Sequence, residues 1–555
     1  MKKVVSLVMI TLVIFSFLGF SQEVKYGGTL KFTAAWGPVT FNINPLLASG
    51  QSLGIKAMIY ETLYYLNGLT GEEVPILAES YQWENDNKDL VMNLREDVFW
   101  TDGKGFTSED VVFTFNLVKK YPSLDINGIW SESFGLESIE SRGDYQVVFK
   151  FREPNVPSLQ NIANQYIVPE HIWSKVEDPV TYTNQKPIGT GPFLFESFDS
   201  SNYIMKAVKN SNYWMEERPY IDGIEIRSVT SVNQVVLQLL NDEIDWGTPG
   251  SMDPHEVWVP ADKENNKYWW PVTNTNILYL NTQKAPFNDA AFRKAVSIAI
   301  DKKTADERGN FGIPGIAHPT GIIPTQLEKW FDSGLNELAN ELNSYNPQKA
   351  QKILEEAGYR KDKQGNLLGK DGKILPTFNI LVGAGWTQFI NMARNISANL
   401  KEIGINAIID QQPWGTYMSS LMTGTYDMAI CWGTGTGSNP YNFYYRMFDP
   451  AFSATEIGQA ATSGYSRYTH PEITNALNTF RKTTDEKLQK EMMHTIERII
   501  LEEVPIIPID NRPENFNAYT ERRFIGWPSA ENPYAVIGGI DAPASKLTAI
   551  TIHLK

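Results

Sequence analysis

Cysteine is almost absent from this sequence, with one residue, Cys431, in a chain of 555. A single thiol excludes any intrachain disulfide, and its distance from the N-terminus excludes a lipid-modified cysteine next to a leader segment. The neighbours Ala429, Ile430 and Trp432 are apolar. The sequence therefore predicts that Cys431 is a small, buried hydrophobic residue.

Histidine and positive charge are also scarce. The six histidines are scattered singly along the chain, so no cluster suggests a metal site, and no cofactor is expected. Lysine and arginine total 49 against 64 aspartates and glutamates, which leaves a formal charge of −15. A chain this acidic is a poor partner for nucleic acid or for an anionic membrane surface.

One mostly apolar run stands out at the N-terminus, at residues 4–18, between two lysines and a pair of small residues. The run is short for a membrane span. Residues 1–21 are therefore expected to be a secretory signal that is cut before Gln22. Because this segment carries only the two lysines, the remaining chain has a formal charge of −15 − 2 = −17. The expected product is a soluble periplasmic protein without a lipid anchor.

The stretch at 276–302 has the clearest local structure. Residues 277–280 form an apolar run too short for a helix, and a proline follows, so a buried strand is predicted. Asn288 can cap a following helix, and Phe292 can pack back onto Phe287 as a hydrophobic staple. Apolar residues then repeat at helical spacing. The stretch predicts a strand, a turn and a helix.

The same stretch resembles a known family. Its pattern N-x-x-x-x-P-F-(N/D)-D-x-x-x-R-(K/Q)-A, which begins here at Asn281, is similar to a segment of the family 5 extracellular solute-binding proteins. These are the peptide, nickel and oligosaccharide receptors of ABC importers. Further matches follow the family's order and cover essentially the whole mature chain: YGGTLKF at 26–32, LAES at 77–80, LREDVFWTDGKGFTSEDVVFTF at 94–115, IGTGPF at 188–193, YWMEERPYIDGIEIR at 213–227 and EVPIIPI at 503–509.

The resemblance implies an α/β fold of the type II periplasmic binding protein class. Two large lobes, lobe I and lobe III, would close on a ligand like a Venus flytrap, and an additional domain II would distinguish the family. A chain of 555 residues is too long for one ordinary core, in agreement with several lobes. The implied division is a signal peptide at 1–21, lobe I at 22–59, 180–273 and 523–555, domain II at 60–179, and lobe III at 274–522.

Local patterns predict further elements. A helix is expected at 106–120, where Thr107 and Asp110 have the spacing of a capping box. The segment at 362–373 lacks the ligand order of a calcium loop and is expected to be a polar hairpin. The other expected elements are helices at 232–240 and 347–358 and strands at 29–32, 405–410 and 426–433.

Tryptophan is abundant, with 15 residues. A pyranose ring suits such a composition, because its apolar C–H face can lie on an indole while its hydroxyls form directional hydrogen bonds. The alternative for some of these tryptophans is burial in the core, and the alternative for Trp36 is a packed loop anchor. Seven tryptophans lie outside the positions where the family places structural aromatics: Trp36, Trp246, Trp269, Trp270, Trp386, Trp414 and Trp432.

The resemblance places Trp414 and Trp432 of lobe III in the ligand cleft. In peptide-binding members, the residues after the second of these tryptophans are similar to Ala-Asp-Tyr, and the aspartate holds the ammonium group of the peptide. Here a glycine-rich stretch with Thr434, Ser438 and Asn439 follows. A buried ammonium without a carboxylate is costly, whereas hydroxyl and amide groups suit a neutral, hydroxylated ligand.

These observations predict a periplasmic receptor that captures a short neutral oligosaccharide and delivers it to the permease subunits of an ABC importer. The sugar is expected to be β-linked, such as a cello-, laminari-, manno- or xylo-oligosaccharide, and the receptor to be a monomer. Oligopeptide binding is the alternative. A glycoside hydrolase would need two carboxylates facing one bond, and no such pair stands out, so no catalytic residue is assigned. The predicted ligand-binding residues are Trp36, Trp246, Trp270, Asn276, Trp386, Trp414, Trp432, Thr434, Ser438 and Asn439.

Overall fold

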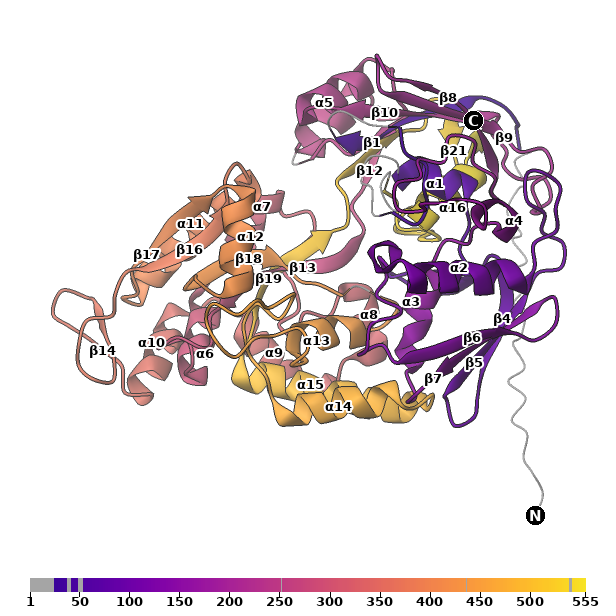
Figure 1. Ribbon diagram of the computed structural model, residues 1–555. Coiled ribbons are helices and arrows are strands. Elements are labelled where there is room, and N and C mark those ends of the chain that lie inside the picture. Colours follow the sequence, from indigo (N-terminus) through magenta and orange to yellow (C-terminus); the bar gives the residue numbers. More distant parts are fainter. Residues whose placement is uncertain (1–23, 37–40, 48–52, 251, 436, 539–541) are drawn as a thin grey trace.

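The structure is a computed structural model that describes residues 24–36, 41–47, 53–250, 252–435, 437–538 and 542–555 (Figure 1). The expected signal segment and its cut site lie outside these residues. Within them, no helix is long and apolar enough to cross a membrane.

Lobe I is built on a seven-stranded sheet in the upper right of Figure 1. β1 pairs in parallel with both β10 and β11, so the carboxyl ends of these three strands lie at one edge of the sheet. Along the sheet, the strands are β12 (Asn266–Trp269), β20 (Asn517–Thr520), β11 (Trp246–Gly247), β1 (Thr29–Trp36), β10 (Gly223–Val229), β9 (Ile204–Lys209) and β8 (Phe193–Asp199).

Two helices from opposite ends of the chain, α1 (Leu53–Ile59) and α16 (Ala542–Thr551), pack together in lobe I. Beside them, Glu61 forms a buried ion pair with Lys546 at 2.7 Å. Tyr213 and Trp214 donate further hydrogen bonds to the same carboxylate, at 2.7 and 2.9 Å. The carboxylate is therefore fully partnered and ties the C-terminal helix to the start of domain II.

Domain II contains a four-stranded antiparallel sheet against which α2 (Ser108–Lys120) packs. The predicted capping box is confirmed, because the side chains of Thr107 and Asp110 each accept from the other residue's backbone. The indole of Trp100 donates to Asp110 at 3.1 Å, which explains why this tryptophan is structural. The strands in order are β4 (Ala78–Glu84), β5 (Asp89–Leu94), β7 (Gln146–Phe151) and β6 (Leu136–Ser141), and a small hairpin of β2 (Tyr64–Leu66) and β3 (Glu73–Pro75) precedes them.

Lobe III, on the left of Figure 1, has a five-stranded mixed sheet. β16 pairs in parallel with β17 and with β18, while β13 runs antiparallel to β18 and to β19. The carboxyl ends of the three parallel strands therefore meet at one edge. The order is β17 (Ala407–Gln412), β16 (Phe378–Gly383), β18 (Met428–Trp432), β13 (Val272–Leu280) and β19 (Ile507–Pro513).

Helices and buried apolar side chains cover both faces of the lobe III sheet. The predicted strand, turn and helix at 276–302 are confirmed, with Phe287 and Phe292 in contact at 5.7 Å between ring centroids. The helix cap is Asp289 rather than Asn288. The helices are α6 (Ala290–Ala299), α7 (Lys302–Asn310), α8 (Pro324–Trp330), α9 (Asn336–Asn343), α10 (Pro347–Glu356), α11 (Thr387–Glu402), α12 (Trp414–Thr423), α13 (Tyr441–Phe448), α14 (Pro471–Arg481) and α15 (Glu486–Glu503).

Two chain segments join lobe I to lobe III, and they lie side by side. One leads from β12 to β13 through Pro271, and the other leads from β19 to β20 through Glu514. The amide of Glu514 donates to the carbonyl of Pro271 at 3.0 Å, and the hydroxyl of Thr273 donates to the Glu514 carboxylate at 2.6 Å. Because β20 already belongs to the lobe I sheet, the chain returns to lobe I by Asn517, and the predicted end of lobe III at residue 522 was too late.

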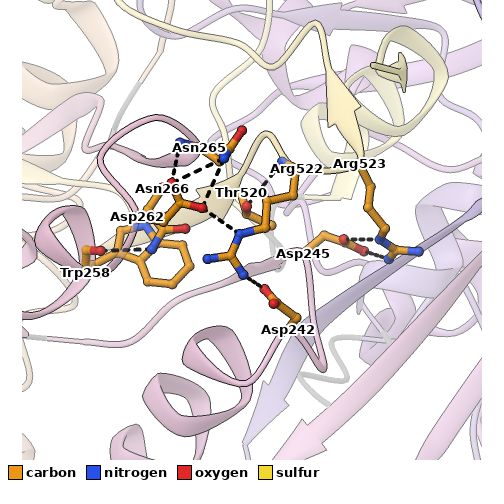
Figure 2. Close-up of polar contacts among 9 residues, drawn as sticks. All are labelled: Asp242, Asp245, Trp258, Asp262, Asn265, Asn266, Thr520, Arg522 and Arg523. Atoms are coloured by element: carbon orange, nitrogen blue, oxygen red, sulfur yellow. Dashed lines mark hydrogen bonds and ion pairs between the residues drawn. The ribbon is translucent and has the colours of Figure 1, made fainter.

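A cluster of ion pairs holds the chain where it re-enters lobe I (Figure 2). Arg523 donates through Nε to the buried Asp245 at 2.9 Å, and a second nitrogen of its guanidinium contacts the other carboxylate oxygen. Arg522 pairs with the more exposed Asp262 at 2.8 Å and with Asp242. Two aspartates of this cluster lie in the loop after α5 (Val232–Leu240), which is the predicted helix at 232–240.

Candidate functional site

Three of the predicted tryptophans meet at the carboxyl edge of the lobe III sheet. Trp386 follows β16, Trp414 begins α12 directly after β17, and Trp432 is the last residue of β18. Their ring centroids lie 5.3 to 6.4 Å apart, and the indoles of Trp414 and Trp432 are stacked with an interplanar angle of 15°. Ligands of open α/β sheets bind outside the carboxyl ends of the strands. The fold thus places this group, which we call the tryptophan cluster, where a ligand is expected.

The tryptophan cluster presents its most exposed ring at Trp414, whose exposed fraction is 53%. Trp386 and Trp432 are half-buried. The cluster rests on Tyr417, which is fully buried and donates to the carbonyl of Ile430 at 2.8 Å. A rigid base and an open indole face form a flat apolar platform for a ring-shaped ligand.

A cation lies beside this platform. The guanidinium carbon of Arg512, on β19, is 4.8 Å from the ring centroid of Trp432. Burial lowers the pKa of Arg512 from its ordinary value, and the side chain has no hydrogen bond or ion pair with any described residue. Its planar fork of N–H donors is therefore available to oxygen atoms of a ligand. Arg512 was not among the predicted residues, and the available signal was a charged residue three positions after the apolar run 505–509.

Buried polar side chains lie next to Arg512 in the lobe III sheet. Asp510 accepts hydrogen bonds from Asn276 at 2.9 Å and from Asn310 at 2.5 Å. Burial raises the pKa of Asp510 to about 8 and that of Asp306 to about 6, and the charge of Asp306 adds to the shift at Asp510. Asn276 was predicted to bind ligand. Its side chain is 3% exposed and its amide nitrogen donates to Asp510, while its side-chain oxygen has no hydrogen-bond partner among the described residues.

The loop after Trp432 turns toward domain II. The hydroxyl of Thr434 contacts the sulfur of Met447 at 3.9 Å, and the side chain of Asn439 accepts from the amide of Tyr441 at 3.0 Å at the start of α13. Ser438 is half-buried, and its carbonyl lies close to Gly71 of domain II. The predicted polar residues Thr434 and Asn439 thus have structural partners within lobe III.

The predicted tryptophans of lobe I lie in different surroundings. Trp246 was expected to offer a ligand surface, but it is fully buried, stacks on Phe32 at 5.0 Å and donates to Asn517 at 3.0 Å. Its strand has neighbours on both sides, so this ring belongs to the core. Trp270 is 6% exposed and packs edge-on against Phe516 at 4.9 Å, between the two crossing segments. Trp36 ends β1 at the carboxyl edge, and its side chain lies outside the described residues.

No group of acidic, histidine or cysteine side chains suited to a metal ion occurs in the described part of the chain. The thiol of Cys431 is buried, as predicted, and burial raises its pKa to about 11. The lobe III edge offers aromatic faces for stacking and the N–H groups of Arg512 for hydrogen bonding.

Comparison with known proteins identifies the fold. The model of the family described as "Bacterial extracellular solute-binding proteins, family 5 Middle" matches residues 72–454, well over half of the chain. The oligopeptide-binding protein AppA of Bacillus subtilis is 26% identical over 437 residues, which is 76% of each chain. The dipeptide-binding protein of Escherichia coli is 26% identical over 87% of this chain and 89% of its own.

Solved structures of a Thermotoga maritima protein titled as a periplasmic oligopeptide-binding protein are also similar, at 26% identity. One covers 95% of this chain and 99% of its own, with a TM-score of 0.82. A second structure of the same relative, titled as bound to mannohexaose, gives a TM-score of 0.74.

The matched proteins are substrate-binding proteins rather than enzymes, and the α/β architecture agrees with the type II periplasmic binding class. The family match, at residues 72–454, spans most of domain II, the second part of lobe I, the crossing segment at Pro271 and much of lobe III. This chain belongs to family 5 of the bacterial extracellular solute-binding proteins.

Proposed function

We propose that this protein is the receptor of an ABC importer for a short neutral oligosaccharide, which it holds against the tryptophan cluster and encloses by closure of lobe I on lobe III. The tryptophan cluster carries the proposal. A sugar ring can stack its C–H face on Trp414, while the N–H fork of Arg512 meets pairs of hydroxyl oxygens.

The residues next to Trp432 also favour a sugar over a peptide. Residues 433–440 contain no acidic side chain to receive the ammonium group of a peptide. The mannohexaose bound to the Thermotoga maritima relative supports the same ligand class. Of the sugars considered, manno-oligosaccharides therefore take the first place, ahead of cello-, laminari- and xylo-oligosaccharides.

Oligopeptide binding is the second candidate, because relatives such as AppA and the Escherichia coli dipeptide-binding protein are named for peptides. A peptide would use Arg512 differently, by pairing its C-terminal carboxylate with the guanidinium. The two candidates thus differ in the charge of the ligand group that meets Arg512.

Titration calorimetry separates the candidates. We expect heat on titration with manno- or other β-linked oligosaccharides, no heat with a mixed peptide library, and recovery of the sugar at its original length after release. Binding of peptides alone would contradict the sugar proposal. Appearance of shortened sugar in excess of protein, from hydrolase-free samples, would contradict the receptor proposal.

A further inference from the structure

A polar cavity of about 490 Å³ lies between domain II and lobe III, away from the tryptophan cluster. Sites for small molecules span roughly 300–1,000 Å³, so its size is in the range of a ligand site. Domain II contributes lining residues between Asn127 and Asn164, and lobe III contributes residues from Gly435 to Phe452 together with Arg481. The cavity exists only because the two parts face each other.

The domain II wall presents amide groups in fixed orientations. The side-chain nitrogen of Asn155 donates to the carbonyl of Phe134 at 2.9 Å, and that of Asn161 donates to the carbonyl of Asn127 at 2.8 Å. With their nitrogens held, these side chains keep their oxygens as oriented acceptors. The hydroxyl of Ser158, a residue that is 1% exposed, has no hydrogen-bond partner among the described residues. Buried hydroxyls normally have hydrogen-bond partners, so the Ser158 hydroxyl can still form a hydrogen bond with a ligand.

The lobe III wall combines aromatic rings with N–H donors. Tyr441 and Tyr445 are stacked at 5.5 Å with an interplanar angle of 16°, and Phe452 contacts the second ring at 5.0 Å. The guanidinium of Arg446 lies 5.4 Å from the centroid of Phe452. Arg481 also lines the cavity, and its buried Nε has no partner among the described residues. Aromatic faces, donors and acceptors thus surround one space.

The cavity is linked along the chain to the tryptophan cluster. Gly435 lines it and follows Trp432 by three residues. Gly435 has a φ of +88°, and a Cβ there would lie 2.2 Å from the carbonyl oxygen of Asn442, so only glycine allows this path of the loop. The loop that follows Trp432 of the tryptophan cluster therefore forms part of the cavity wall.

We propose that this cavity is a second carbohydrate-binding site, which holds the far end of a longer oligosaccharide whose near end lies on the tryptophan cluster. Sugar hydroxyls both donate and accept, as do the two walls, and sugar rings pack on aromatic side chains. This inference rests on the proposed function. The inference adds that domain II and lobe III together recognise the length of the oligosaccharide.

The test uses the full-length receptor and a series of manno-oligosaccharides from disaccharide to hexasaccharide. Ser133→Trp places a bulky ring in the cavity from an exposed lining position, and Ser200→Trp makes the same change on an exposed turn of lobe I. We expect Ser133→Trp to weaken hexasaccharide binding about tenfold, which corresponds to the loss of about one hydrogen bond between the sugar and a charged side chain of the cavity. Disaccharide binding should be unchanged. Ser200→Trp should affect neither sugar.

A second pair of variants removes a donor instead of filling space. Arg481→Met deletes a cavity-lining guanidinium, and Lys482→Met deletes the neighbouring surface charge, which does not line the cavity. Only Arg481→Met should weaken hexasaccharide binding. Equal effects of the two variants, or a Ser133→Trp protein that binds all lengths as the wild type does, would overturn the second site and leave the proposed function standing. Absence of any sugar binding by the wild-type protein would instead overturn the proposed function.

Discussion

Trp414 is exposed although it belongs to the tryptophan cluster. Its replacement should therefore affect ligand binding more than the stability of the fold. We expect Trp414→Ala to weaken sugar binding by about 1–4 kcal/mol, the range for an aromatic anchor. Because its exposed fraction is 53%, its removal should cost less stability than removal of a buried tryptophan, with about 0.5–1.5 kcal/mol for each ring contact. Calorimetric titration and thermal unfolding of the same sample measure both quantities.

Trp246 provides the opposite case within the same molecule. It is fully buried between Phe32 and Trp527, so Trp246→Ala should lower the free energy of unfolding by about 3–5 kcal/mol while the folded fraction binds sugar normally. A Trp414→Ala protein that unfolds as early as Trp246→Ala, yet binds sugar at full affinity, would show that the tryptophan cluster is structural.

The carboxyl pair of Asp306 and Asp510 makes stability depend on pH. Their pKa values of about 6 and about 8 are above the unfolded value of about 3.9, so the native state binds more protons between these limits. The stability that the pair contributes is present below pH 4 and is lost as pH rises toward 8. In Asp510→Asn, the free energy of unfolding should therefore fall less steeply as pH rises, by up to about 1 kcal/mol per pH unit. Urea unfolding at pH 5.5, 7 and 8.5 measures the slope.

Other buried groups titrate in the same range and remain in both proteins. The pKa of Glu497 is raised to about 8 and that of Lys302 is lowered to about 7, both by burial. The informative quantity is thus the difference in unfolding free energy between wild type and Asp510→Asn at each pH. A difference that stays constant from pH 5.5 to 8.5 would show that the pair does not take up a proton on folding.

At the scale of elements, two adjacent arginines after β20 have unequal partners (Figure 2). The side chain of Asp245 is 4% exposed, whereas those of Asp242 and Asp262 are 56% and 23% exposed. Arg523→Ala should cost about 3 kcal/mol because it leaves a buried carboxylate without its cation. Arg522→Ala should cost less than about 1 kcal/mol, since its partners keep their water. Chemical unfolding of the two variants provides the comparison, and equal losses would contradict the role of burial.

Local elements were predictable where the signal was local. The helix at 232–240, the capping box of Thr107 and the contact between Phe287 and Phe292 follow from neighbouring residues alone, and the structure confirms them. The burial of Trp246 and Asn276 was not predictable in this way. Their burial depends on strands β20 and β19, which come more than 200 residues later in the chain. Pairing partners at such separation leave no trace in the local pattern.

The candidate site also combines residues that the sequence identified with an arrangement that it did not. Trp414 and Trp432 could be proposed because the family resemblance places them in the cleft, and Trp386 because it lies outside the positions where the family places structural aromatics. Their meeting depends on the parallel order of β17, β16 and β18, which the sequence alone did not establish. Arg512 and the cavity beside domain II were missed, because both arise from contacts between distant segments.

For the whole molecule, the side-by-side crossing segments predict a hinge. Lobe I and lobe III can rotate about Pro271 and Glu514 without breaking either sheet. Sugar binding should therefore reduce the radius of gyration in small-angle X-ray scattering, because a ligand that contacts both lobes favours the closed arrangement. The control is the same protein with a sugar that gives no heat in calorimetry. An unchanged scattering curve at saturation would contradict closure.

The hydrogen bond between Glu514 and Pro271 has a topological consequence. The lobe III segment, from Val272 to Pro513, begins and ends at neighbouring points, so it is inserted into lobe I as a block whose removal would leave the order of the lobe I strands uninterrupted. The tryptophan cluster and Arg512 belong entirely to this block. Exchange of the block between related receptors would transfer one half of the recognition surface without rebuilding the other, a route by which one transport scaffold could acquire new ligands during evolution.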